Sequence, residues 1–450
     1  MLKLIWKILK HLLVGYKKEK LNKDATFLSS KDTNILLNPN NSGLLLDGYK
    51  SRLSQKKSFE HLAIIARTGA WKTSSFIIPN ILTLDECSLI ITDPSWEIRA
   101  KTEAILKEKW FKIIVLNPTN LEESQTYNPL LFANSSDEIK EISKILVSSS
   151  DTSWGAEDKF WEAGAQKIIT MILKCLKNRE KLERSEVNLK DLQRELNYFL
   201  SKQWAEFIAT YGDDDLVDEY RGFLSGNEKT TESFLSTAQI SLDSLSSENI
   251  AQFLSKNSVR FQDLRDEKTA LFFQVPEQKM HYYSFILNLF YTQFFNFAMQ
   301  SLENTKMPIY TLLDEFGHQT IPHFSSIITT IRKYKVSISI ILQSISQLEA
   351  KYWKSEADII INGGISNKIF FGGADPATTR MLSEIMGTTT QTDEQSHYKR
   401  TEQLLSSFNI RTLEDEQALY IYSNKLPVLL DIVPYYKNRK LLKLLKPKLF

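Results

Sequence analysis

The chain has 450 residues, 42% hydrophobic and 24% charged, with a formal net charge of +2 at pH 7. This composition is typical of a soluble globular protein with two or three domains. It excludes a polycation that binds nucleic acid through bulk charge, so any such contact must use a local basic surface. The only cysteines, Cys87 and Cys175, are too few for a disulfide framework or a zinc site, which indicates an intracellular setting.

Residues 1–25 are predicted to form a short basic amphipathic helix. Leu2, Ile5 and Leu9 recur at helical spacing with lysines between them. No apolar run is long enough to span a bilayer, and the absence of a small-residue cleavage site argues against a signal peptide. Two interpretations remain equally open: attachment to an anionic membrane surface, or docking on the chain's own core or on a partner.

The first α/β segment is predicted within residues 26–134. Apolar, β-branched runs at 61–66 (HLAIIA), 88–92 (SLIIT) and 113–116 (IIVL) predict buried strands, and residues 73–84 predict a helix after the first of them. Alternation of strands and helices predicts a mainly parallel sheet with crossover helices.

The strand rhythm stops in residues 135–255, which predicts an inserted all-α domain. Helices are expected there at 160–175, 189–207 and 233–246. Strands resume within residues 256–435, at 270–275, 309–313, 337–342 and 368–371. An aromatic helix at 282–300 is interpreted as core packing, and residues 436–450 as a basic C-terminal tail.

The segment ARTGAWKTS, residues 66–74, predicts a phosphate-binding loop. Such a loop needs a strand, a glycine-rich turn, and then Lys and Ser/Thr opening a helix, so that backbone N–H groups and the lysine reach phosphate oxygens while the hydroxyl holds Mg²⁺. Gly69, Lys72 and Thr73 fit in type and spacing, whereas Ala66 and Trp71 depart from the glycine-rich pattern. The candidate nucleotide-binding residues are Thr68, Gly69, Ala70, Trp71, Lys72, Thr73 and Ser74.

The segment YTLLDEF, residues 310–316, ends an apolar strand with two carboxylates. In a phosphate-loop ATPase, Asp314 would join Thr73 in holding the metal, and Glu315 would orient or deprotonate the attacking water. In isolation two solvated carboxylates would be the better interpretation. After a phosphate loop in a matching sheet, the balance reverses.

Two further residues are candidates for catalysis. Gln343 follows the strand SISIIL and is placed to sense a γ-phosphate, while Arg332 precedes that strand and is a candidate arginine finger for a neighbouring subunit. Without a family pattern, a strand-end Gln and a surface Arg remain the simpler interpretation.

Taken in order, these motifs resemble the type IV coupling proteins of conjugation and type IV secretion, of the TraG/TraD type, over residues 45–435. The most specific segments are LLDEFGHQTIP at 312–322 and ILQSISQLEAKYW at 341–353; SLIITDPSWEIRAKT, FKIIVLNP and FWEAGAQ add to them.

The resemblance implies a RecA-like P-loop NTPase domain of the α/β class with an inserted all-α domain. It implies a hexameric ring that uses ATP and Mg²⁺ to deliver single-stranded DNA or a relaxase–DNA complex to the components of the secretion channel. It also implies the roles described for Lys72, Thr73, Asp314, Glu315, Gln343 and Arg332. The same resemblance places the chain in the cytoplasm, at the cytoplasmic face of the inner membrane. Family members usually carry N-terminal transmembrane helices, which this sequence lacks, so the amphipathic helix would have to provide membrane contact.

Four tryptophans stand where family-like patterns have glycine: Trp71, Trp96, Trp110 and Trp353. The chain has 15 glycines, about half of average usage. One hypothesis is that these positions are UGA codons that the host reads as glycine. The alternative is a true Trp71 and a hydrolysis-deficient family member that acts as a substrate receptor or scaffold. A ring motor for DNA repair or chromosome segregation is a third possibility.

Overall fold

The computed structural model describes residues 24–149, 158–300, 307–392 and 399–445, and the predicted N-terminal helix lies almost entirely outside these ranges. Its centre is a nine-stranded sheet with the order β11-β10-β7-β1-β6-β5-β2-β4-β3. The strands from β7 to β3 are parallel, whereas β10 pairs antiparallel with β7, and the edge strand β11 pairs antiparallel with β10. The predicted α/β class with a mainly parallel sheet is therefore confirmed.

All seven predicted strands are present, with small shifts at their ends. They are β1 (Leu62–Ile65), β2 (Ser88–Thr92), β3 (Lys112–Leu116), β4 (Thr269–Phe273), β5 (Ile309–Leu313), β6 (Val336–Leu342) and β7 (Asn367–Phe371). Four further strands were not predicted from the sequence: the edge strands β10 (Gln417–Tyr422) and β11 (Val428–Asp431), and a separate ribbon of β8 (Thr388–Thr392) and β9 (Lys399–Gln403).

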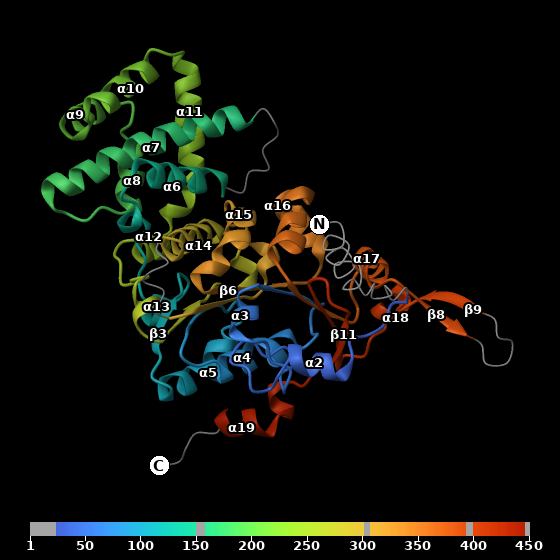
Figure 1. The fold of residues 1–450 in the computed structure, drawn as a ribbon. Coiled ribbons are helices and arrows are strands. Elements are labelled where there is room, and N and C mark those ends of the chain that lie inside the picture. Colours follow the sequence, from blue (N-terminus) through green and yellow to red (C-terminus); the bar gives the residue numbers. More distant parts are fainter. Residues whose placement is uncertain (1–23, 150–157, 301–306, 393–398, 446–450) are drawn as a thin grey trace, which may run out of the picture.

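The parallel strands are mainly apolar and largely buried because both faces of the sheet are covered. Along β1, Ala63 and Ile65 join one hydrophobic cluster, while Leu62 and Ile64 join the other. The first cluster lies under helices α14 (Ser284–Ala298), α15 (Phe324–Thr330) and α16 (Ile345–Asp358). The second lies against α2 (Ser30–Leu36), α4 (Ile78–Thr83) and α5 (Glu97–Glu108), on the opposite face in Figure 1.

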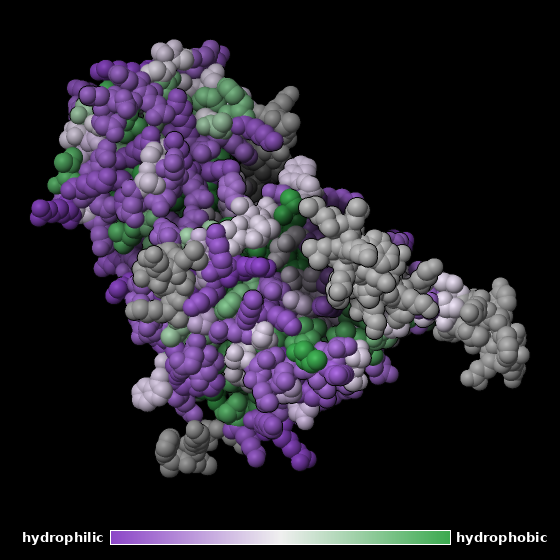
Figure 2. All heavy atoms as spheres, in the orientation of Figure 1, coloured by the Kyte–Doolittle hydropathy of each residue, from purple (hydrophilic) through white to green (hydrophobic). Residues whose placement is uncertain are grey.

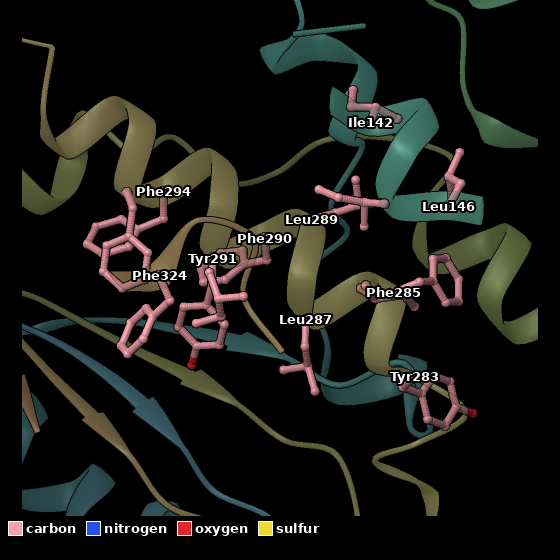
Figure 3. Close-up of a cluster of buried hydrophobic side chains, with 14 of the residues drawn as sticks. Ile142, Leu146, Tyr283, Phe285, Leu287, Leu289, Phe290, Tyr291, Phe294 and Phe324 are labelled. Atoms are coloured by element: carbon pink, nitrogen blue, oxygen red, sulfur yellow. The ribbon is translucent and has the colours of Figure 1, made fainter. Parts of the chain in front are cut away.

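Helix α14 contributes the densest part of the first cluster. Phe290, Tyr291 and Phe294 are fully buried, and Figure 3 shows them in one cluster with Phe324 of α15 and Ile142 of α6 (Ser136–Ser148). Tyr291 and Thr92 share a hydrogen bond of 2.7 Å through their hydroxyls. Most aromatic residues of this helix therefore form core, as the sequence predicted.

Between β3 and β4 the described chain forms helices and no strand. After α6 come α7 (Asp158–Glu183), α8 (Leu189–Leu196), α9 (Lys202–Tyr211), α10 (Asp214–Leu224), α11 (Glu228–Ser241) and α12 (Glu248–Phe253). Figure 1 shows α7 to α11 grouped away from the sheet, and Figure 2 shows that their visible surface is mostly hydrophilic. The single helix predicted at 189–207 is two helices, because Ser201 caps a new helix by accepting a hydrogen bond from the N–H of Trp204.

The remaining helices are short. They are α3 (Gln55–Ser58), α13 (Asp263–Asp266), α17 (Pro376–Met386), α18 (Ser407–Arg411) and α19 (Arg439–Leu445). Part of the predicted basic tail is thus the packed helix α19, whose Leu441 is buried with Ile78, Leu82 and Ile105. Within the described ranges, no helix combines the length and apolarity needed to cross a bilayer.

The buried imidazole of His61, at the start of β1, predicts a pH-dependent stability. Its Nδ1 accepts a hydrogen bond of 3.1 Å from the N–H of Ile338, and burial lowers its pKa from 6.5 to about 3. The unfolded chain therefore takes up a proton first as pH falls, so stability is complete above the unfolded pKa and decreases below it. We expect a loss of about 1.4 kcal/mol per pH unit between the unfolded pKa of 6.5 and the folded pKa of about 3.

Chemical denaturation at a series of pH values should show a shallower dependence for His61→Asn, because Asn tolerates the positive φ of this position and does not titrate. Equal slopes for the two proteins would contradict this prediction.

Candidate functional site

The order of the strands brings three predicted motifs together at the carboxyl ends of neighbouring parallel strands. Strand β6 lies between β1 and β5, and all three are parallel. The phosphate loop follows β1, Gln343 follows β6, and the Asp-Glu pair follows β5. Ligands of open α/β sheets bind outside the carboxyl ends of the strands, and all three motifs lie at those ends.

The phosphate loop is a tight turn that leads directly into a helix. The N–H of Ala70 donates to the carbonyl of Arg67 over 3.2 Å. Gly69 has φ 81°, and a Cβ added to it would meet no atom within 4 Å, so its backbone conformation rather than crowding favours glycine. One wide turn at Thr73–Ile77 then continues into α4. Thr68 and Gly69 are exposed, whereas Ala70 and Lys72 are buried.

Lys72 joins the loop to the Asp-Glu pair. Its ammonium donates to Oε1 of Glu315 and lies 4.0 Å from Oδ1 of Asp314, and its side chain is only 9% exposed. A buried ammonium is tolerated when such partners compensate for its lost hydration. The lysine and both carboxylates therefore form one charge cluster, although Lys72 and Glu315 are 243 residues apart in the sequence.

The acidic pair has two different environments. Asp314 is 5% exposed; its Oδ2 accepts a 3.4 Å hydrogen bond from the Thr73 hydroxyl, and its Oδ1 accepts the N–H of Glu315. Burial raises the pKa of Asp314 to about 6, although the Lys72 charge acts in the opposite direction. Glu315 adopts a left-handed conformation, φ 52° and ψ 40°, in the turn that aims it at Lys72.

Gln343 reaches the same cluster, and a residue not predicted from the sequence supports it. Its Nε2 lies 3.4 Å from Oε2 of Glu315, and its backbone N–H donates to Oε1 of Gln347. A Cβ on Gly317 would lie 2.7 Å from that same Gln347 oxygen, so the glycine in DEFG makes room for the glutamine. The spacing of the two glutamines in LQSISQLE was the available signal.

Arg332 does not join this cluster. It is exposed in the turn Ile331–Tyr334, which precedes β6, whereas Gln343 follows the opposite end of the same strand. In this subunit it therefore lies away from the phosphate loop, and its role as a finger for a neighbouring subunit stays a prediction.

Two other polar residues, neither of them assigned a role from the sequence, lie beside Glu315. Side-chain ligand atoms of Glu277, Glu315 and His318 lie within 4.8 Å of one another. Glu277 comes from the turn after β4, and only the folded sheet brings that turn to the edge. Trp71 lies in the loop itself. The Lys437 ammonium lies over the Trp71 ring, with its nitrogen 4.8 Å from the ring centroid.

The sheet and this cluster define a RecA-like P-loop α/β domain with an associated helical part. The chain belongs to the type IV secretory system conjugative DNA transfer family, whose pattern matches residues 16–448. Protein VirD4 of Rhizobium radiobacter is 24% identical over 410 residues, covering 85% of this chain and 58% of that protein. Conjugal transfer protein TraG of the same organism is 23% identical, covering 75% and 54%. The chain thus spans somewhat more than half the length of these relatives.

Solved structures share the fold. The bacterial conjugative coupling protein TrwB, in a trigonal form with sulphate, has a TM-score of 0.73 at 15% identity, covering 91% of this chain and 93% of that chain. VirB4 of Thermoanaerobacter pseudethanolicus has a TM-score of 0.55 at 12% identity, covering 88% and 97%. At these identities the likeness concerns the fold alone.

The two adjacent hydroxyls of the loop predict different responses to removal. Thr73 faces Asp314, whereas the hydroxyl of Ser74 donates to the carbonyl of Trp71 within the loop. Mg²⁺ should raise the nucleotide affinity of the unchanged chain, and we expect Thr73→Ala to reduce this increase by about tenfold or more. Loss of a residue that supports a metal typically lowers metal affinity by about 10–100-fold. Ser74→Ala is the matched control and should leave it unchanged. Calorimetric titration with and without Mg²⁺ measures both, and equal Mg²⁺ dependence in the two variants would contradict this placement.

Proposed function

We propose that the chain is a coupling ATPase of a conjugation or type IV secretion system. It hydrolyses ATP and delivers single-stranded DNA, or a relaxase–DNA complex, to the transfer channel. The observation that carries the proposal is the contact of Lys72 with Glu315 beside Asp314, because it joins a phosphate loop to an acidic strand end across the intervening strand. Family membership, and TrwB structures with ADP and Mg²⁺ or with non-hydrolysable analogues, support it.

The residues present fit this chemistry. Bound ATP with Mg²⁺ supplies the phosphoanhydride bond that breaks and a divalent charge near the phosphates. With nucleotide bound, Lys72 would exchange its contact with Glu315 for phosphate oxygens, and the Thr73 hydroxyl and Asp314 would be the residues that hold the metal. The released Glu315 carboxylate would accept a proton from the attacking water as the water oxygen bonds to the γ-phosphorus and ADP leaves, and Gln343, already beside Glu315, would sense the γ-phosphate. Nucleotide binding thereby frees the catalytic base.

We further propose the assembly that the family implies. Copies of the chain form a ring, with six subunits as the expected number, and Arg332 of one subunit stabilises the charge that develops at the neighbour's nucleotide. Residues 135–255 form the all-α domain that faces the substrate-presenting complex, and residues 26–134 and 256–435 form the nucleotide-binding domain. The ring lies in the cytoplasm at the inner membrane, which it contacts through residues 1–25.

A second candidate is a family member that binds substrate without hydrolysis. Trp71 favours it, because a bulky residue at a left-handed position of the phosphate loop obstructs the approach of phosphate. An ATPase assay on the chain with tryptophan at 71 and on Trp71→Gly separates the two functions.

Glu315→Gln should retain ATP binding and lose hydrolysis, because the amide keeps a hydrogen-bonding oxygen but cannot take the proton. We expect turnover to fall by about 10²–10⁴-fold. Glu384→Gln, an exposed carboxylate on α17, is the matched control. The assay is phosphate release with and without single-stranded DNA, and undiminished turnover in Glu315→Gln would remove the proposed catalytic base.

The proposed action of Arg332 on a neighbouring subunit's nucleotide can be tested by substitution. Arg332→Ala should lower turnover by about 10³-fold, whereas Lys333→Ala, the adjacent exposed cation, should not. Mixing Arg332→Ala with Lys72→Ala should restore part of the activity, because some interfaces then pair an intact phosphate loop with an intact arginine. Wild-type turnover in Arg332→Ala, or mixed rings no more active than either variant, would exclude a role in trans.

A further inference from the structure

Four tryptophans have backbone conformations that favour glycine. The φ angles of Trp71, Trp96, Trp110 and Trp353 are 55°, 62°, 65° and 51°. For an L-residue this region places Cβ against the following carbonyl, and a bulky residue there is an outlier. Of the eight tryptophans in the chain, Trp161 lies inside helix α7 and Trp204 inside α9, and the other two lie outside the described residues. Among the six that are described, only the four that family-like patterns would write as glycine are left-handed.

Trp110 occupies a glycine position at the end of α5. After the cap Lys109, the N–H of Trp110 donates to the carbonyl of Lys107, and the N–H of Phe111 donates to the carbonyl of Leu106. This pair of bonds is the Schellman motif, whose left-handed residue is most often glycine. Phe111 and Leu106 add the hydrophobic contact of the motif, since both are buried in one cluster. The indole itself is 86% exposed and contributes no core.

Trp96 and Trp353 are similar at two other helix boundaries. Trp96 precedes α5 with φ 62° and ψ 0° and makes no side-chain cap, because the carboxylate of Asp93 accepts the N–H groups of Ile98 and Arg99 instead. Trp353 has φ 51° and ψ 148° at a kink inside α16, close to a region that glycine almost alone adopts. The Trp353 side chain is 80% exposed. Neither indole lies in the buried core.

The other non-glycine residues with positive φ differ in kind. All of them carry polar or charged side chains: His61, Glu86, Arg184, Glu315, His323, Lys335 and Ser423. Among described residues tryptophan is therefore the one large apolar type in this region, and it occurs there four times. By contrast, Trp204 is fully buried, and its ring centroid lies 5.3 Å from that of Phe199, as expected of a core tryptophan.

We propose that residues 71, 96, 110 and 353 are glycine in the protein that the cell makes, because its ribosomes read UGA as glycine at these codons. Residues 161 and 204 are true tryptophans encoded by UGG. The proposal deepens the assignment of the nucleotide site and rests on it at position 71, since a glycine there restores the residue that the loop needs next to Lys72. Its first test concerns only the chemical identity of the chain, and so can succeed or fail independently of the proposed function.

The first experiment reads the gene and the protein. Sequencing should find UGA at the four positions and UGG at 161 and 204, and mass spectrometry of peptides from the native host should give glycine masses at the four. UGG codons at the four positions, or tryptophan masses in those peptides, would overturn the proposal.

The second experiment compares recombinant chains. A variant with all four changes, Trp71→Gly, Trp96→Gly, Trp110→Gly and Trp353→Gly, should melt at least about 5 °C above the chain with four tryptophans, because four strained backbones relax. The matched pair Trp161→Gly and Trp204→Gly should melt lower, since one replaces a helical residue and the other empties a core site. An unchanged or lower melting temperature in the fourfold variant would contradict glycine at these positions.

Position 71 can be separated from the other three. Trp71→Gly alone should increase ATP affinity by at least about tenfold, whereas the triple change at 96, 110 and 353 should raise the melting temperature without altering affinity. If the fourfold variant is stabilised but binds no nucleotide, the glycine assignment stands and the ATPase proposal fails.

Discussion

The contact between the Lys72 ammonium and the carboxylates of Asp314 and Glu315 is the constraint on which the site depends. Three charged groups lie close together with little exposure to water, and removing such ions from water costs several kcal/mol each unless they are paired. Pairing requires that the turns after β1 and β5 meet, and the placement of β6 between those strands sets their separation. The order of the parallel strands, rather than any local sequence, therefore holds the cluster together.

The same cluster links binding to catalysis. Glu315 is held by Lys72 on one side and faces Gln343 on the other, so the proposed base is neutralised while no phosphate competes for the lysine. Its left-handed backbone adds local strain of the kind that persists where the surrounding structure enforces it. Gln347 from α16 holds the backbone of Gln343, and Gly317 in the turn after β5 leaves room for the Gln347 side chain.

Backbone geometry is also informative about residue identity. A side chain can be exchanged at a surface position at little cost, but a positive φ imposes the same demand on every L-residue that occupies it. Trp110 meets every hydrogen bond of a glycine-type helix end while its indole projects into solvent. The conformation thus records glycine where the written sequence has tryptophan, and the phosphate loop contains one such position.

Residue type and spacing along the chain were enough to predict the seven parallel strands and the helical character of the segment between β3 and β4, because buried strands and amphipathic helices have local signatures. The roles of the turn after β1 and of the Asp-Glu pair after β5 in nucleotide hydrolysis stay predictions. Strands β10 and β11 were not predicted, although β10 (QALYIY) has an apolar, aromatic strand pattern; the antiparallel pairing of both strands appears only in the fold. It took the folded sheet to bring Glu277 beside Glu315, and to place Arg332 at the opposite end of the strands. Spacing along the chain carries local geometry, whereas proximity across the sheet follows from strand order, which no single segment encodes.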